Sequence, residues 1–222
     1  PLAAHPEMWL DENGDYSFEV HHRSHRAVGV PGTVAGFDKA HRLYGSADWD
    51  GLVEPSVELA SDGFLLSEAL AGSIARFVAG RASQYEATVA AFTNNGASYV
   101  AGDTWRQPDL ARTLERIRDD RSDGFYRGTT ARLIAAEMRR GNGLITEEDL
   151  GLYEARERTP ITGTYRGYDV ISMPPPSSGG VAIVTALNIL EEYDLSSMGH
   201  NSAPYLHHLA EAMRSAFRDR AT

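Results

Sequence analysis

Apolar residues spaced three and four positions apart recur along most of the chain, and this spacing is typical of helices with one buried face. It predicts helices over residues 31–45 and 130–140. Further helices are expected to begin at or just after Asp48, Ser67, Ser83, Pro108, Thr146, Val181 and Ser202. Most of these starts carry a side chain that can accept a hydrogen bond from the free amides of a first helical turn.

Local signals refine these helix predictions. Ser83 and Glu86 have the spacing of a capping box, and Thr146 and Asp149 have it too. Pro55 lies inside the run that follows residue 48. Because proline has no amide proton, we expect the helix to restart there.

A change of pattern near residue 159 predicts the only well-formed β pairing. Residues 159–166 and 168–173 are rich in β-branched and aromatic side chains, and Arg166-Gly167 separates them as a hairpin turn would. Residues 16–20 alternate and could form a strand within an otherwise irregular leading segment, residues 1–27. The expected fold is therefore mainly α with one β-hairpin (α+β). Neither a repeat nor an obvious linker interrupts the chain, so we expect residues 1–222 to form a single domain.

Composition excludes several classes of function. The chain has 21 basic and 31 acidic residues and a formal charge of −10, which opposes binding to nucleic acid or anionic lipid. It has no cysteine, so disulfides, thiolate nucleophiles and cysteine-based metal sites are excluded. No apolar run approaches the ~20 residues of a membrane span. We therefore predict no nucleic-acid partner and no membrane span in this chain.

Two groups of residues are candidate metal ligands. His21, His22 and His25 crowd one segment, but no carboxylate or cysteine completes a ligand set, and we interpret them as surface histidines. His207 and Glu211 lie one helical turn apart without the H-E-x-x-H pattern of zinc peptidases, which favours an ordinary contact. The sequence thus predicts neither a metal site nor a cofactor.

Two further segments are candidate sites for catalysis or anion binding. Glu147, Glu148 and Asp149 fall in a predicted first helical turn, where the helix dipole favours negative charge, and adjacent helical residues do not converge as a catalytic pair. Residues 174–180 read PPPSSGG before an apolar helix. Their amides could bind an anion such as a carboxylate, but we favour a rigid approach and cap whose glycines let another backbone come close.

The residue identities of eight short segments, taken in chain order, are more specific than their hydrophobic periodicity. They are VPGTVAG (30–36), FYRG (125–128), TEEDL (146–150), YRGY (165–168), MPPPSSGG (173–180), LNILE (187–191), EA (211–212) and FRDR (217–220). This series resembles the large subunit of the γ-glutamyltranspeptidases from about Val28 onward. The resemblance implies an N-terminal-nucleophile hydrolase with an αββα sandwich, and this chain would be part of its large subunit.

The resemblance also implies a reaction. Members of this family are made as one chain that cuts itself and exposes a threonine at the start of a small subunit. That threonine attacks the γ-glutamyl amide of glutathione or a related compound, and the acyl group passes to water or to an amino-acid acceptor. The implied partners are the small subunit of the same precursor and small γ-glutamyl substrates. Export to the periplasm or the medium is expected from the resemblance alone.

The chain lacks the two family motifs that carry the catalytic and substrate-binding residues. It has no Thr-Thr-His-like stretch, and Thr222 matches none. Pro1 resembles the tail of the motif that holds the substrate-binding arginine, so that arginine is expected upstream. We therefore assign no catalytic or substrate-binding residue and expect this chain alone to be inactive.

Two alternatives stay open at this point. One is a cephalosporin-type acylase or a capsule-polymer depolymerase of the same superfamily. The other is a stand-alone helical interaction module, which a stop codon near Thr222 would favour.

Overall fold

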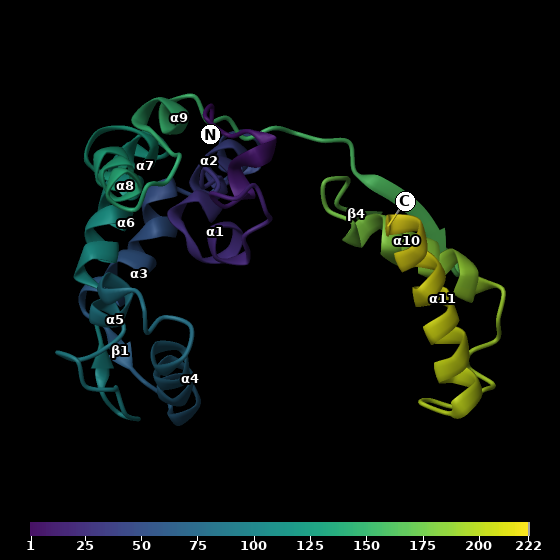
Figure 1. Ribbon diagram of the computed structural model, residues 1–222. Helices are drawn as coiled ribbons and strands as arrows, with labels where there is room; N and C mark the ends of the chain where they lie inside the picture. Colours follow the sequence, from purple (N-terminus) through teal and green to yellow (C-terminus); the bar gives the residue numbers. More distant parts are fainter. Residues whose placement is uncertain (222) are drawn as a thin grey trace. The chain divides into compact units, whose positions relative to one another are not determined.

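The computed structural model describes residues 1–221 and is mainly helical (Figure 1). Its contacts divide it into two compact units, Pro1–Ala155 and Arg156–Thr222. The single domain expected from the sequence stays a prediction, because two compact units can belong to one domain when further chain packs against both. Among the described residues, no helix has both the length and the apolar character that crossing a membrane requires.

The first unit is built almost entirely from helices. Its elements are η1 (Pro6–Trp9), α1 (Phe18–Arg23), η2 (His25–Ala27), α2 (Thr33–Tyr44), α3 (Trp49–Ser61), β1 (Phe64–Leu65), α4 (Glu68–Ala79), α5 (Glu86–Ala91), β2 (Thr104–Trp105), α6 (Pro108–Asp120), α7 (Asp123–Tyr126), α8 (Gly128–Arg140) and α9 (Glu147–Gly151). The second unit contains β3 (Ile161–Tyr165), β4 (Tyr168–Ser172), α10 (Gly179–Glu191) and α11 (Ala203–Ala221). The mainly α fold with one hairpin is confirmed.

Several helix starts are confirmed together with their caps. The Ser67 hydroxyl accepts a hydrogen bond from the Leu70 amide at 3.2 Å and begins α4. Thr146 and Asp149 form a complete capping box at the start of α9. These signals involve residues at most three positions apart, so they can be recognised in the sequence.

Three local predictions are wrong. Residues 16–20 do not form a strand, because the Ser17 hydroxyl caps α1 by accepting from the Val20 amide. The leading segment is accordingly not irregular throughout, since it contains η1, α1 and η2. Ser83 does not cap α5. Its hydroxyl donates to the Gly80 carbonyl in the turn after α4, and Tyr85 takes the cap position.

A fourth prediction is also wrong, because Pro55 does not divide its helix. α3 continues from Trp49 to Ser61 with Pro55 inside it. α3 packs along α6, and Val57 and Ala60 of α3 are buried. Burying apolar side chains against a neighbouring helix offsets the loss of one backbone hydrogen bond.

Two apolar clusters organise the first unit. One joins α7, α8 and α9 through Tyr126, Ala131, Met138, Ile145 and the fully buried Leu150. The other joins β1 to α4 through Leu66, Ala71 and Ile74. The Tyr126 hydroxyl donates to the Pro31 carbonyl at 2.6 Å, which fixes the start of α2 on the first cluster. Burial raises the pKa of Tyr126, so its hydroxyl stays protonated and able to donate.

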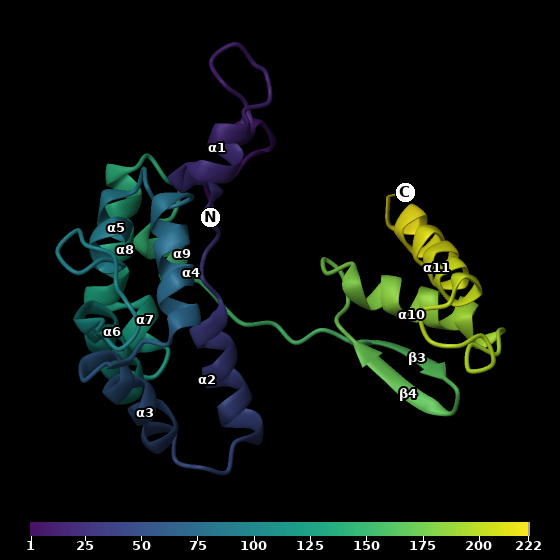
Figure 2. The same ribbon diagram turned by 90° about the horizontal axis from the view of Figure 1, so that it is seen from below.

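In the second unit, α10 lies between the hairpin and α11 (Figure 2). β3 and β4 pair antiparallel from Ile161↔Ser172 to Tyr165↔Tyr168, as the sequence predicts. Arg166 and Gly167 both have positive φ, 49° and 83°, as a two-residue turn of type I′ requires. Apolar side chains remain exposed on the hairpin and on α10: Tyr168, Ile171, Val181 and Ile183.

The glycine pair at the start of α10 provides a stability prediction. A Cβ on Gly180 would lie 2.2 Å from the Met173 carbonyl oxygen, whereas a Cβ on Gly179 would meet only the Ser177 hydroxyl at 3.7 Å. Gly180→Ala is therefore expected to destabilise the second unit by about 2 kcal/mol through overpacking. Gly179→Ala, the matched control, should be neutral or slightly stabilising, because alanine favours the helix. Hydrogen exchange of the α10 amides measures both, and equal protection in the two variants would contradict the prediction.

Candidate functional site

The histidines of the leading segment contact neighbouring side chains. His21 Nδ1 lies 2.8 Å from the Tyr16 hydroxyl, and the His22 ring stacks on Phe18. His25 Nε2 lies 2.7 Å from Glu137 Oε1 on α8. Within the part of the chain that the structure describes, no three His, Cys, Asp or Glu side chains are arranged to hold a metal ion.

Glu137 is the centre of a small charged group. The Arg140 guanidinium donates to both of its carboxylate oxygens, at 2.8 Å and 2.5 Å, and His25 approaches one of them. Hydrogen bonds from Arg140, and then from His25, lower the pKa of Glu137 to about 2. Glu137 is therefore a carboxylate at every physiological pH, and it is already neutralised by Arg140.

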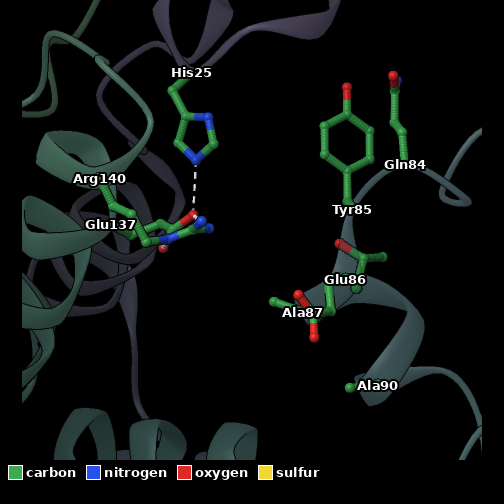
Figure 3. A pocket seen from close by; sticks show the side chains of 9 residues that line it. His25, Gln84, Tyr85, Glu86, Ala87, Ala90, Glu137 and Arg140 are labelled. Atoms are coloured by element: carbon green, nitrogen blue, oxygen red, sulfur yellow. Dashed lines mark hydrogen bonds and ion pairs between the residues drawn. The ribbon is translucent and has the colours of Figure 1, made fainter.

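This charged group forms one wall of a cavity of about 700 Å³. Figure 3 shows His25, Glu137 and Arg140 on one side and Gln84, Tyr85 and Glu86 on the other. One wall comes from η2 and α8, and the opposite wall comes from the start of α5 and the turn before it. The sequence did not indicate this site, because its two walls are more than forty residues apart in the chain.

A buried carboxylate that the sequence analysis missed lies on α2. Asp38 accepts hydrogen bonds from Arg121 Nε at 2.7 Å, Ser122 Oγ at 2.7 Å and Arg42 Nε at 2.9 Å. The Arg121 guanidinium also lies over the Trp49 ring, 4.5 Å from its centre. This group ties α2 and α3 to the turn between α6 and α7.

The electrostatics of Asp38 follow from these contacts. Burial alone would raise its pKa, but the hydrogen bonds from Arg121, Ser122 and Arg42 together outweigh burial and lower the pKa to about 2. A signal was present in the sequence, because Asp38 follows Val34 by four residues on the apolar face of its helix. Every carboxylate oxygen of Asp38 is occupied, so the group stabilises the fold and offers no free base.

The remaining sequence candidates have structural partners. Asp149 caps α9 and accepts from the Leu2 amide at 2.5 Å. Burial would raise the pKa of Asp149, but the hydrogen bonds from Leu2 and Thr146 lower it. Glu211 forms an ion pair with Arg214, the residue three positions along α11. None of these carboxylates is placed as half of a catalytic pair.

The segment 174–180 packs closely against the hairpin. Ser178 occupies the cap position of α10 without a side-chain cap, and the Ser177 hydroxyl accepts from the Gly179 amide at 3.4 Å. The backbone of Gly180 lies against the Met173 carbonyl. This geometry agrees with a rigid approach to α10, and the binding of an anion at these amides stays a prediction.

Comparison with known proteins settles the family. The family model described as gamma-glutamyltranspeptidase matches residues 1–222. The chain belongs to the γ-glutamyltranspeptidase family. This confirms the resemblance, and the matches fall in the large-subunit region.

Individual relatives agree with this assignment. The chain is 45% identical to the glutathione hydrolase proenzyme of Escherichia coli (strain K12), over 100% of this chain and 38% of that protein. The crystal structure of Helicobacter pylori gamma-glutamyltranspeptidase is 38% identical with a TM-score of 0.95, over 100% of this chain and 64% of that one. The Bacillus anthracis transpeptidase enzyme CapD is 34% identical with a TM-score of 0.75, over 87% of this chain and 66% of that one. The chain therefore spans well under half of the curated E. coli relative.

Proposed function

We propose that the protein to which this chain belongs hydrolyses or transfers the γ-glutamyl group of glutathione and related amides. The observation that carries this proposal is the match of all 222 residues to the γ-glutamyltranspeptidase family. The 45% identity to a glutathione hydrolase proenzyme supports glutathione as the substrate class. Export to the periplasm or the medium is part of the same proposal and rests on the resemblance alone.

Within that protein, we assign residues 1–222 the role of a scaffold. The only Thr-Thr pair, Thr129-Thr130, precedes Ala131 rather than a histidine. The Thr130 side chain is buried, donates to the Gly124 carbonyl at 2.8 Å and accepts from Arg116 Nε at 2.9 Å. A hydroxyl held in this way cannot reach a substrate, so we expect the nucleophile on another segment of the complete protein.

The second unit offers a surface for that other segment. Tyr168 and Ile171 of the hairpin are 76% and 71% exposed, and Ile183 of α10 is 51% exposed. Exposed apolar side chains favour association with a partner. A small subunit released from the same precursor is the partner we propose, since the E. coli relative is itself described as a proenzyme.

An acylase or depolymerase of the same superfamily is the second candidate function. The cephalosporin acylase from Bacillus halodurans matches 85% of the chain with a TM-score of 0.76, whereas the H. pylori enzyme matches 100% with a TM-score of 0.95, which favours γ-glutamyl chemistry. A stand-alone helical interaction module has less support, because the match to the enzyme family covers the whole chain.

The test is a substrate comparison with the complete protein. We expect release of p-nitroaniline from its γ-glutamyl derivative, and faster release when glycylglycine is added as an acceptor. The glutaryl derivative, which lacks only the α-amino group, should react far more slowly. In a site that binds the α-ammonium group of the substrate, the protein groups that accept its hydrogen bonds would be left unpaired by this analogue. Preference for the glutaryl compound would instead indicate an acylase, and inactivity on both would contradict the proposed reaction.

A further inference from the structure

A second hollow of about 810 Å³ adjoins the cavity of Figure 3 and shares Gln84, Tyr85 and Thr88 with it. One side is formed by α1 and the other by the end of α4 and the turn that leads to α5. The Tyr85 hydroxyl donates to the Arg23 carbonyl at 2.8 Å and joins the two sides. This bond holds the α5 segment beside α1.

The charge of this hollow is opposite to that of the chain as a whole. Arg23, Arg81 and His22 line it, and among the described residues that line it there is no aspartate or glutamate. Arg23 is paired with Glu19 at 2.8 Å, but about half of its side chain remains exposed. Arg81 has no hydrogen bond or ion pair within the described structure. A guanidinium without a carboxylate partner is available to an anion.

The apolar part of the hollow is aromatic. Phe18 is 53% exposed and Phe77 is 39% exposed, so each ring retains surface for a ligand. The His22 ring stacks on Phe18 at 4.2 Å, and Phe92 packs edge-on against Phe77 at 5.4 Å. These contacts hold both rings in place and reduce the entropy that binding would otherwise cost.

We propose that this hollow binds a small aromatic anion, namely a planar ring that carries a phosphate or carboxylate group. The ring packs against Phe18 and Phe77, and the anionic group pairs with Arg81 beside His22. Guanidinium groups bind phosphates and carboxylates through paired N–H donors, and aromatic rings favour edge-to-face or offset contacts with one another. The proposal does not depend on the γ-glutamyl reaction.

The test measures binding to the complete protein by titration calorimetry, with phenyl phosphate as the probe. We expect weak but saturable binding, with methyl phosphate and benzyl alcohol each binding more weakly because each lacks half of the recognised chemistry. Phenylacetate, tested in parallel, shows whether phosphate or carboxylate is preferred. Methyl phosphate binding as tightly as phenyl phosphate would overturn the aromatic part of the proposal.

Two variants locate the site. Arg81→Gln should weaken phenyl phosphate binding by about tenfold, the effect of one charge-assisted hydrogen bond. Arg76→Gln is the matched control. It removes the same charge from the exposed face of α4, where the Arg76 side chain donates a hydrogen bond to Ser73, and it should change the affinity less than twofold. Equal effects of the two variants would mean general electrostatic attraction and would overturn the site, as would the absence of binding to the unsubstituted protein.

Discussion

Residues 1–222 alone are expected to release no measurable p-nitroaniline from a γ-glutamyl anilide under conditions in which the complete protein turns it over. Amide cleavage needs a nucleophile, a base beside it and donors for the oxyanion. In the described residues, the buried Thr130 hydroxyl is held by Gly124 and Arg116, and the Asp38 carboxylate is held by three donors. Removing a complete nucleophile–base unit from a hydrolase lowers turnover by about 10⁶-fold. The turnover that remains would be too slow for this assay to detect.

The segment 174–180 is the control for this prediction. The purified chain is assayed beside the same chain with Ser177→Ala and Ser178→Ala. Turnover that disappears in the double variant would overturn the scaffold role and make this segment an active site. Turnover that persists in both chains would point to a contaminating enzyme or to an unrecognised nucleophile, and assay after a second chromatographic step distinguishes these two cases.

The features that were predictable from the sequence are those decided within a few residues. Ser67 and the Thr146–Asp149 pair specify helix starts because each cap and its amide partner are three residues apart. The hairpin was predictable because its turn, Arg166-Gly167, immediately joins its strands. Such interactions depend on near neighbours, although the failure of Ser83 to cap α5 shows that the surrounding turn can override them.

The features that could not be predicted from the sequence depend on residues far apart in the chain. Pro55 stays inside α3 because α6, more than fifty residues further on, packs along that helix. Arg81 and His22 line one hollow only because Tyr85 bonds to the backbone of Arg23, sixty-two residues away. No periodicity or motif encodes such pairs in a single sequence. They are determined when the elements pack.

The Asp38 group is the clearest case of such long-range order. Its carboxylate oxygens bind Arg121 and Ser122, which lie 83 and 84 residues further along the chain. Arg121 has a φ of 56°, a region that side chains rarely occupy, so these contacts also stabilise an unfavourable backbone conformation. We therefore expect loss of the charge at Asp38 to be among the most damaging single changes in the first unit.

Asp38→Asn keeps the shape of the side chain and removes its charge. The pKa of Asp38 is lowered from 3.8 to about 2, and a fall of that size corresponds to about 2.5 kcal/mol of folding free energy above the unfolded-state pKa. Water screens the exposed Arg42 side chain, which reduces this value somewhat. In the variant, Arg121 loses its carboxylate partner, which adds to the loss. We expect a loss of about 2–3 kcal/mol at neutral pH.

The pH dependence identifies the cause of that loss. A carboxyl group whose pKa is lower in the folded than in the unfolded chain stabilises the fold fully above the unfolded value of 3.8, and this stabilisation disappears as the pH falls to about 2. The difference in stability between the unsubstituted chain and Asp38→Asn should accordingly shrink across that interval. Urea unfolding followed by tryptophan fluorescence measures it, because all three tryptophans lie in the first unit and Trp49 contacts Arg121.

Asp123→Asn is the matched control for Asp38→Asn. Asp123 lies one residue beyond Ser122 and pairs with Arg127 at 3.1 Å, but its side chain is 72% exposed. An exposed pair of this kind contributes less than about 1 kcal/mol, so the control should unfold almost as the unsubstituted chain does. A loss of similar size in both variants, or a difference at Asp38 that does not change between pH 4 and pH 2, would contradict the stabilising role of the buried carboxylate. The expected contrast arises because water screens the charge of Asp123, whereas three donors of the protein itself replace water around Asp38.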